Sequence, residues 1–294
     1  MSASTIPDSL RPRRSVLYMP AANARALEKA KSIAADALIF DLEDAVAPDA
    51  KPEARHQAVA AAASGEYGGR EVTIRCNGLD TPWGADDIAA TATSGAAAVV
   101  IPKVESTAQL DAASAALDAA GAPAAMTIWV MVETPTAILD ARAIAAHERV
   151  SVLIMGTNDL AKELRAALAP GRAALLPHLQ TALLAAREAG KVILDGVYND
   201  IKNAEGFEAE CRQGADFGFD GKTLIHPAQV EPANGVWAPS DDEVAEARQI
   251  IDAFTEAEAD GRGVVTVNGR MIENLHVDNA RRTLAVADAI AALG

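Results

Sequence analysis

The sequence is poor in cysteine, in aromatic residues and in positive charge. It has 2 cysteines and 4% aromatic residues among 294, and its 26 Lys and Arg face 41 Asp and Glu, a formal net charge of −15. So few cysteines cannot build a disulfide framework, and we expect a reducing, cytoplasmic environment. The acidic balance argues against nucleic acid and anionic membrane surfaces, because both are bound mainly through Lys and Arg.

Long hydrophobic runs are absent as well. A span of the bilayer needs about 18 apolar residues, whereas the longest run, around Met126–Val132, has the length of a strand. The N-terminal segment Met1–Arg14 is polar and contains proline, without the apolar centre of a signal sequence. Half of the chain is nevertheless hydrophobic, and its length suffices for a large core. These features predict a folded protein that is not inserted in a membrane.

Short apolar runs alternate with Ala-rich stretches that favour helix. Several runs are continuously apolar, which is typical of parallel strands buried on both faces. The eight runs favour a closed (β/α)8 TIM barrel. A doubly wound open sheet is the second candidate, although no Gly-x-Gly-x-x-Gly motif follows the first run. The predicted strands are Ser15–Tyr18, Ala37–Phe40, Val72–Cys76, Ala97–Ile101, Thr127–Val132, Val152–Met155, Val192–Leu194 and Asp216–Phe219.

The alternation stops after Pro227. We expect residues 1–232 to form the barrel and residues 233–294 a C-terminal appendage, because the latter are too few for a core of their own. The appendage is expected to pack on the barrel or on a neighbouring subunit. Its predicted parts are a connection at Asn234–Ser240, a helix at Asp241–Asp260, a hairpin at Gly261–Gly269 and a helix at Glu273–Leu293.

Charged residues follow the predicted strands. Glu133 and Asp159 come after the fifth and sixth strands, and neighbouring strand ends lie about 5 Å apart. Two carboxylates there can share a hard cation, and oxygen ligands without Cys favour Mg²⁺ or Mn²⁺ over zinc. Arg75 follows the third strand, where it can polarise a carbonyl beside the metal and stabilise an enolate. Each residue alone would also suit a helix cap, a salt bridge or a solvated turn, so the prediction rests on the set.

Longer motifs carry a resemblance to a known family. They are Arg14-Ser-Val-Leu-Tyr-Met-Pro, Asp41-Leu-Glu-Asp-Ala-Val, Ile74-Arg-Cys-Asn-Gly, Val132-Glu-Thr-Pro, Gly156-Thr-Asn-Asp-Leu, and Gly218-Phe-Asp-Gly-Lys with Ile225-His-Pro. Together they resemble the citrate lyase β-subunit-like family over nearly the whole chain. That family contains malyl-CoA, β-methylmalyl-CoA and citramalyl-CoA lyases and malyl-CoA thioesterases.

The resemblance implies a Mg²⁺-dependent barrel enzyme that acts on CoA thioesters of short hydroxy acids and assembles as a homotrimer or homohexamer. Glu133 and Asp159 resemble the metal ligands of the family, and Arg75 resembles the Arg that holds the reacting carbonyl. Glu43 and Asp44 resemble acidic residues that line the metal and substrate pocket. We therefore expect retro-Claisen C–C cleavage to an acyl-CoA and an α-keto acid such as glyoxylate or pyruvate.

The C-terminal part leaves the reaction open. Lyases of the family commonly carry a catalytic Asp after Gly-Lys/Arg-Met-Ile/Val, donated across a subunit interface, whereas this chain has Gly269-Arg-Met-Ile-Glu273. By analogy Glu273 is the acid that protonates the enolate. The tail also resembles the malyl-CoA thioesterase branch, so hydrolysis of (3S)-malyl-CoA to malate and CoA is an alternative. Two further alternatives are a noncatalytic barrel that binds metal and CoA, and an aldolase that acts on free α-keto acids.

The phosphates of CoA need cations that an acidic chain must supply locally. Residues 1–31 carry six basic and two acidic residues, a local charge of +4. Arg14 and Lys31 belong to this segment, and we expect them to contact the CoA phosphates.

Overall fold

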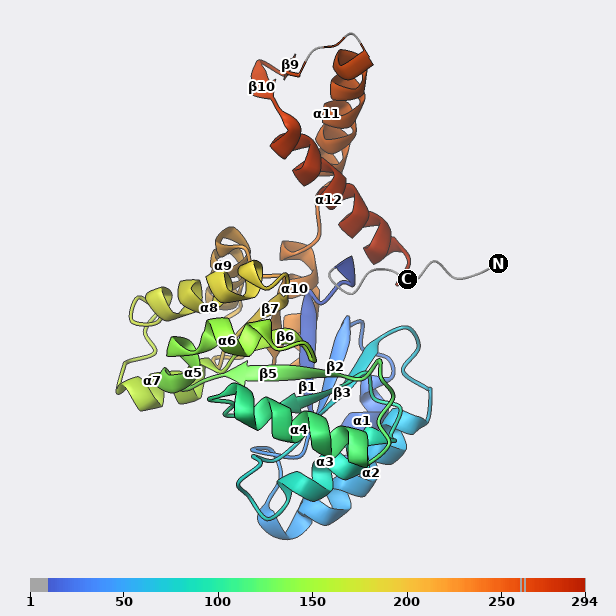
Figure 1. Cartoon of the computed structure of the whole chain (residues 1–294), viewed down its shortest axis with the longest axis vertical. Helices are drawn as coiled ribbons and strands as arrows, with labels where there is room; N and C mark the ends of the chain where they lie inside the picture. The colour runs from blue at the N-terminus through green and yellow to red at the C-terminus, as the bar shows by residue number, and fades with distance from the viewer. Residues whose placement is uncertain (1–9, 260, 262, 294) are drawn as a thin grey trace. The chain divides into compact units, whose positions relative to one another are not determined.

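The computed structural model describes residues 10–259, 261 and 263–293 (Figure 1). The chain divides into two compact units. The larger unit is Arg13–Gly235, and the smaller one contains residues 10–12 and the chain from Val236 onward.

Within the described residues, the larger unit contains a closed barrel of eight parallel strands. Each strand pairs with the next in chain order, and β8 pairs with β1, so the predicted (β/α)8 TIM barrel is confirmed. Because all the strands run the same way, their carboxyl ends share one rim, where sites of this fold are built. The strands are β1 (Ser15–Pro20), β2 (Ala37–Asp41), β3 (Glu71–Arg75), β4 (Ala98–Ile101), β5 (Thr127–Val132), β6 (Val150–Met155), β7 (Val192–Asp195) and β8 (Gly221–Leu224).

Helices connect the strands and cover the outside of the barrel (Figure 1). They are α1 (Ala24–Ala30), α2 (Lys51–Ala63), α3 (Gly84–Ala92), α4 (Thr107–Ala119), α5 (Pro135–Leu139), α6 (Ala141–Ala146), α7 (Thr157–Leu164), α8 (Leu176–Glu188), α9 (Ala204–Phe217) and α10 (Val230–Val236), with 3-10 turns η2 (Pro48–Ala50) and η3 (Pro227–Gln229). Among the described residues, no helix has both the length and the apolar composition needed to cross a membrane.

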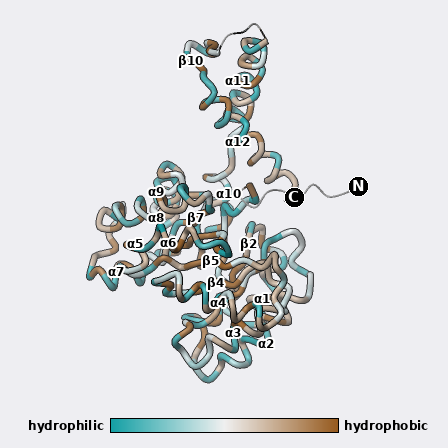
Figure 2. Tube along the Cα trace, viewed as in Figure 1, coloured by the Kyte–Doolittle hydropathy of each residue, from teal (hydrophilic) through white to brown (hydrophobic). Residues whose placement is uncertain are grey.

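Apolar side chains fill the inside of the barrel. The cluster includes Ile39, Val100, Trp129 and Ile154, all fully buried, and the hydrophobic colour runs along β4 and β5 (Figure 2). At the amino ends of the strands the guanidinium of Arg13 lies 5.3 Å from the centre of the Trp129 ring. This packing closes the barrel below the rim, because a TIM-barrel interior is a packed core and not a pore.

The predicted eighth strand, Asp216–Phe219, is wrong. Its first residues end helix α9, and Gly218 takes a left-handed φ of 99° that terminates the helix. The strand is Gly221–Leu224, in which the ammonium of Lys222 is buried 2.8 Å from both Asp195 and Glu210. Apolar pattern alone could not find this strand, because its charged residue is neutralised by partners on β7 and α9.

The smaller unit contains α11 (Asp241–Ala259), strands β9 (Val265–Val267) and β10 (Arg270–Ile272), and α12 (Asn274–Ala291). Phe254, Ile272 and Val277 form its apolar cluster. The helix, hairpin and helix follow the predicted order, but the hairpin turns at Asn268-Gly269 instead of ending there. Both residues have positive φ, 50° and 76°, which suits a two-residue turn between antiparallel strands. Asp260, the expected end of the first helix, lies outside the described residues.

Candidate active site

A cavity of about 360 Å³ opens at the carboxyl-end rim of the barrel. Its charged lining consists of Asp41, Asp44, Arg75, Glu133 and Asp159. The structure thus brings together four of the predicted site residues, which come from the ends of β3 and β5, the loop after β2 and the first turn of α7.

Arg75 is the last residue of β3 and lies in register with Asp41, the last residue of β2. Its Nε and Nη2 donate to the two carboxylate oxygens of Asp41, both at 2.7 Å. Nη1 lies 2.8 Å from Oε2 of Glu43, and the guanidinium stacks 4.9 Å from the centre of the Tyr18 ring. Burial alone would lower the pKa of Arg75, but the neighbouring Asp41 and Glu43 carboxylates hold it well above its ordinary value. Arg75 is therefore a fixed, permanently charged donor at the rim.

Asp41 is a site residue whose role the sequence did not reveal. Its carboxylate also accepts the backbone N–H groups of Glu43 and Ala45, at 2.9 and 3.1 Å. Asp41 therefore shapes the loop after β2 as well as holding Arg75. Asp41 is the first residue of the Asp41-Leu-Glu-Asp-Ala-Val motif, but only the pairing register of β2 and β3 places it opposite Arg75.

Glu133 is the most buried carboxylate of the cavity, with 1% of its surface exposed. Its Oε1 accepts the backbone N–H of Lys103 at 2.8 Å. Gly156 packs so closely that a Cβ there would lie 2.3 Å from Oε2 of Glu133. Burial, with the negative charges of Glu43 and Asp159, raises the pKa of Glu133 to about 7. Ionised Glu133 is therefore costly in this site although Lys103 opposes the shift, and a bound cation would offset that cost.

The carboxylates of the cavity fit a magnesium ion whose coordination shell is completed by substrate and water. In residues 10–259, 261 and 263–293, no three His, Cys, Asp or Glu side chains are gathered so as to hold a metal by themselves. Mg²⁺ is usually bound through one or two carboxylates together with substrate and water, which Glu133 and Asp159 can supply. Among the described residues, the buried Oε2 of Glu43 has an ion pair with Arg75 but accepts no hydrogen bond. The carboxylates of Glu133, Asp159 and Glu43 can therefore offer oxygens to a cation or to a water molecule bound to it.

Lys103 is a second residue whose role the sequence did not reveal. Its Nζ donates to Oε1 of Glu43 at 2.9 Å, while its backbone N–H holds Glu133. Its φ of 51° is unusual for a residue other than glycine. A strained residue that touches two carboxylates suggests a functional constraint on the loop after β4.

Arg14 and Lys31 are not brought to the cavity. Arg14 directly precedes β1, and its Nε and Nη2 donate to the Asp36 carboxylate, both at 2.8 Å. Lys31 directly follows helix α1 and forms ion pairs with Glu28 and Glu66. Both cations lie toward the amino ends of the strands, opposite the rim.

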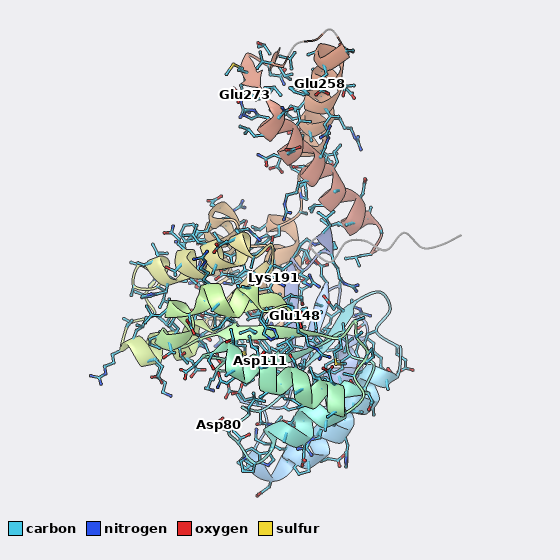
Figure 3. The ribbon with its side chains drawn as sticks, in the orientation of Figure 1. Asp80, Asp111, Glu148, Lys191, Glu258 and Glu273 are labelled. Atoms are coloured by element: carbon cyan, nitrogen blue, oxygen red, sulfur yellow. The ribbon has the colours of Figure 1, made fainter. Side chains whose placement is uncertain are left out.

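Glu273 belongs to the smaller unit, where it caps the amino end of α12 (Figure 3). Its backbone N–H donates to Nδ1 of His276 at 3.1 Å. The capping role explains the position of the Glu273 backbone. That its carboxylate protonates the enolate stays a prediction.

The motif resemblance is borne out by comparison with known proteins. Residues 14–227 match the model of the HpcH/HpaI aldolase/citrate lyase family. The chain belongs to this family. It is 52% identical over 281 residues to a (3S)-malyl-CoA thioesterase of Cereibacter sphaeroides, with 96% of each chain covered. It is also 37% identical over 295 residues to the citrate lyase subunit beta of Escherichia coli K12, with 98% of this chain and 97% of the other covered.

Solved structures of the family share the fold. The crystal structure of the protein CitE from Mycobacterium tuberculosis, in complex with magnesium, acetoacetate and coenzyme A, matches with a TM-score of 0.76 and 30% identity. The match covers 93% of this chain and 97% of that one. Membership of the HpcH/HpaI aldolase/citrate lyase family confirms the predicted family and the prediction of an enzyme.

Proposed function

We propose that the protein is a Mg²⁺-dependent enzyme that hydrolyses a malyl-CoA-type thioester at the barrel rim, releasing CoA and the hydroxy acid. The observation that carries the proposal is one cavity that joins Arg75 to the carboxylates of Glu133 and Asp159. The identity of 52% to a (3S)-malyl-CoA thioesterase, over 96% of both chains, favours hydrolysis. The sequence placed C–C cleavage first, and cleavage is now the second candidate, supported by the likeness to citrate lyase subunit beta.

Glu133 and Asp159 are the proposed magnesium ligands. The ion, when bound there, would supply Lewis-acid polarisation of substrate oxygens. A bound cation also suits the protein itself, because Glu133 is buried beside other carboxylates and is costly to ionise without a counter-charge.

Arg75 would hold the thioester carbonyl oxygen. Arginine has five N–H donors. Asp41 engages two of them, and Nη1 lies against Glu43 and Asp44, so the second N–H of Nη2 is the donor that remains, among the described residues, for a substrate oxygen. Donors fixed before the reaction stabilise the negative charge that develops on the carbonyl oxygen when water attacks, without having to reorganise. In the C–C cleavage alternative, the same donors would stabilise the enolate oxygen of the departing acyl-CoA.

Glu43 and Asp44 are the candidate proton acceptors for the attacking water. Burial, and the nearby charge of Asp44, raise the pKa of Glu43 although Arg75 opposes the effect. A carboxylate whose pKa is raised toward neutrality is better suited to general base catalysis. Asp44 lies at the cavity with a largely exposed side chain.

The proposal leaves out Arg14 and Lys31 as CoA contacts, because carboxylates pair with both at the opposite end of the barrel. The trimer or hexamer, the packing of the appendage on a neighbouring subunit and the cytoplasmic location stay predictions.

Product analysis tests the proposal. Malyl-, β-methylmalyl- and citramalyl-CoA are each incubated with the protein and Mg²⁺ or with EDTA, and free CoA, acyl-CoA and α-keto acid are quantified. Free CoA with malate, without glyoxylate, supports hydrolysis, whereas glyoxylate in equal amount to acetyl-CoA supports cleavage. No turnover of any thioester, or turnover that survives EDTA, overturns the proposal.

Two variants test the metal ligands. Glu133→Gln and Asp159→Asn are expected to abolish calorimetric Mg²⁺ binding and turnover. Glu188→Gln, which removes an exposed carboxylate paired with Arg142 outside the cavity, is the control. Full activity in either ligand variant would exclude that residue as a ligand.

A further inference from the structure

Lys51 is a buried lysine that contacts the loop carrying Glu43 and Asp44. It begins helix α2, and only 5% of its surface is exposed. Its Nζ donates to the backbone carbonyls of Leu42 and Glu43, both at 2.9 Å, and to Oδ1 of Asn77 at 2.6 Å. An ammonium group has three N–H donors, so these three acceptors use all of them.

Asn77, which follows β3, links the Lys51 ammonium to helix α3. Its Nδ2 donates to the carbonyl of Leu42 at 3.0 Å and to Oδ2 of Asp87 at 2.6 Å. Asp87 in turn accepts Nε of Arg55, on α2, at 2.6 Å. The Leu42 carbonyl is therefore held by two side chains that are themselves anchored, and Asn77 stands two residues after Arg75.

We infer that Lys51 is a positioning residue that fixes the Leu42–Glu43 backbone so that the Glu43 carboxylate meets Arg75. The inference rests on the proposed function, since it concerns the same site. The Lys51 ammonium holds the carbonyl of Glu43, while the Asp41 carboxylate holds its backbone N–H. With both peptide groups of Glu43 fixed, its Oε2 lies 2.8 Å from Arg75 Nη1 and its Oε1 2.9 Å from Lys103 Nζ.

The chemistry of the position favours lysine. Three acceptors converge on one nitrogen, which a tetrahedral ammonium can satisfy and a planar guanidinium cannot. Nζ also lies 5.1 Å from the centre of the Trp83 ring, a favourable place for a cation. Burial lowers the pKa of Lys51, but the charges of Asp41, Glu43 and Asp44 oppose this effect, and its ammonium in turn offsets part of their mutual repulsion.

The test compares Lys51→Met with a matched control, Arg70→Met. Arg70 also holds backbone carbonyls, those of Tyr67, Ala30 and Ile33 at 2.6 to 2.7 Å, but far from the rim. Both changes leave carbonyls without donors, so both are expected to lower the urea midpoint. Only Lys51→Met is expected to lower kcat, by about tenfold or more because the reacting groups shift, with KM for the thioester little changed.

Two further measurements keep the inference falsifiable. Lys51→Arg keeps the positive charge but changes the geometry of the donors. This variant tests the positioning role if Lys51→Met fails to fold. Wild-type kcat in Lys51→Arg would overturn the inference. Glu43→Gln is combined with Lys51→Met, and the two losses of kcat are expected to be non-additive, because Lys51 acts through Glu43. Additive losses, or equal kcat in Lys51→Met and Arg70→Met, would also overturn it.

Calorimetric Mg²⁺ binding separates failure of the inference from failure of the proposed function. If the wild-type protein turns over no thioester, the proposed function fails. A several-fold weaker Mg²⁺ affinity in Lys51→Met, but not in Arg70→Met, would then still support positioning of the acidic rim. Equal affinities would overturn the inference.

Discussion

Glu133→Gln is expected to stabilise the metal-free barrel above neutral pH while it destroys the proposed metal site. Glu133 is buried, and burial together with the charge of Glu43 raises its pKa from 4.5 to about 7. An acid whose pKa is raised on folding binds more protons in the folded state, so the protein loses stability as the pH rises from about 4.5 through 7. Gln is neutral at every pH and removes this penalty.

The magnitude follows from the two pKa values. One pKa unit corresponds to about 1.4 kcal/mol, so ionised Glu133 costs the metal-free protein up to ~3 kcal/mol at pH 8. At pH 5 the cost is below ~1 kcal/mol, because the folded state keeps its proton. For a unit of this size each kcal/mol moves the melting temperature by about 2–4 °C.

Urea unfolding of the wild-type protein and the Gln variant in EDTA, at pH 5 and pH 8, measures the effect. The variant is expected to gain stability at pH 8 and little at pH 5, and added Mg²⁺ should stabilise only the wild-type protein. Asp195→Asn is the matched control: Lys222 and Arg172 hold the pKa of buried Asp195 below its usual value, so its loss should destabilise at pH 8. An equal gain at both pH values, or none at pH 8, would refute the reasoning.

Three other substitutions have distinct expected results. Gly156→Ala places a Cβ 2.3 Å from both Cβ and Oε2 of Glu133. We expect the free energy of unfolding to fall by about 1–3 kcal/mol from overpacking and calorimetric Mg²⁺ binding to weaken, and unchanged binding would contradict the close approach. Asp41→Asn removes the charge partner of buried Arg75, so the unfolding free energy should fall by about 3–5 kcal/mol and kcat/KM by about a hundredfold; wild-type values for both would show that the pair is dispensable. Arg13→Met breaks a buried ion pair at the far end of the barrel and should lower the urea midpoint while kcat and KM stay within about twofold, since the rim is untouched.

The sequence by itself determined the architecture and indicated that three charged residues would share one rim. Apolar runs separated by helix-forming stretches are local features, and they predicted the first seven strands. In a parallel barrel every strand ends at the same rim. It follows that Arg75, Glu133 and Asp159 would meet at one cavity, although they are far apart in the chain.

Only the tertiary structure decided which side chains pair. The ion pair between Asp41 and Arg75 depends on the register of β2 and β3. The contacts of Lys51, at the start of α2, and of Lys103, in the loop after β4, depend on how these segments fold against the loop after β2. Local composition is not enough here: Arg14 and Lys31, expected to contact CoA, are paired with carboxylates instead, and Lys222 interrupts the apolar pattern of the eighth strand. The physical reason is that hydrophobic periodicity is written along the chain, whereas the neutralisation of a buried charge depends on residues that only folding brings together.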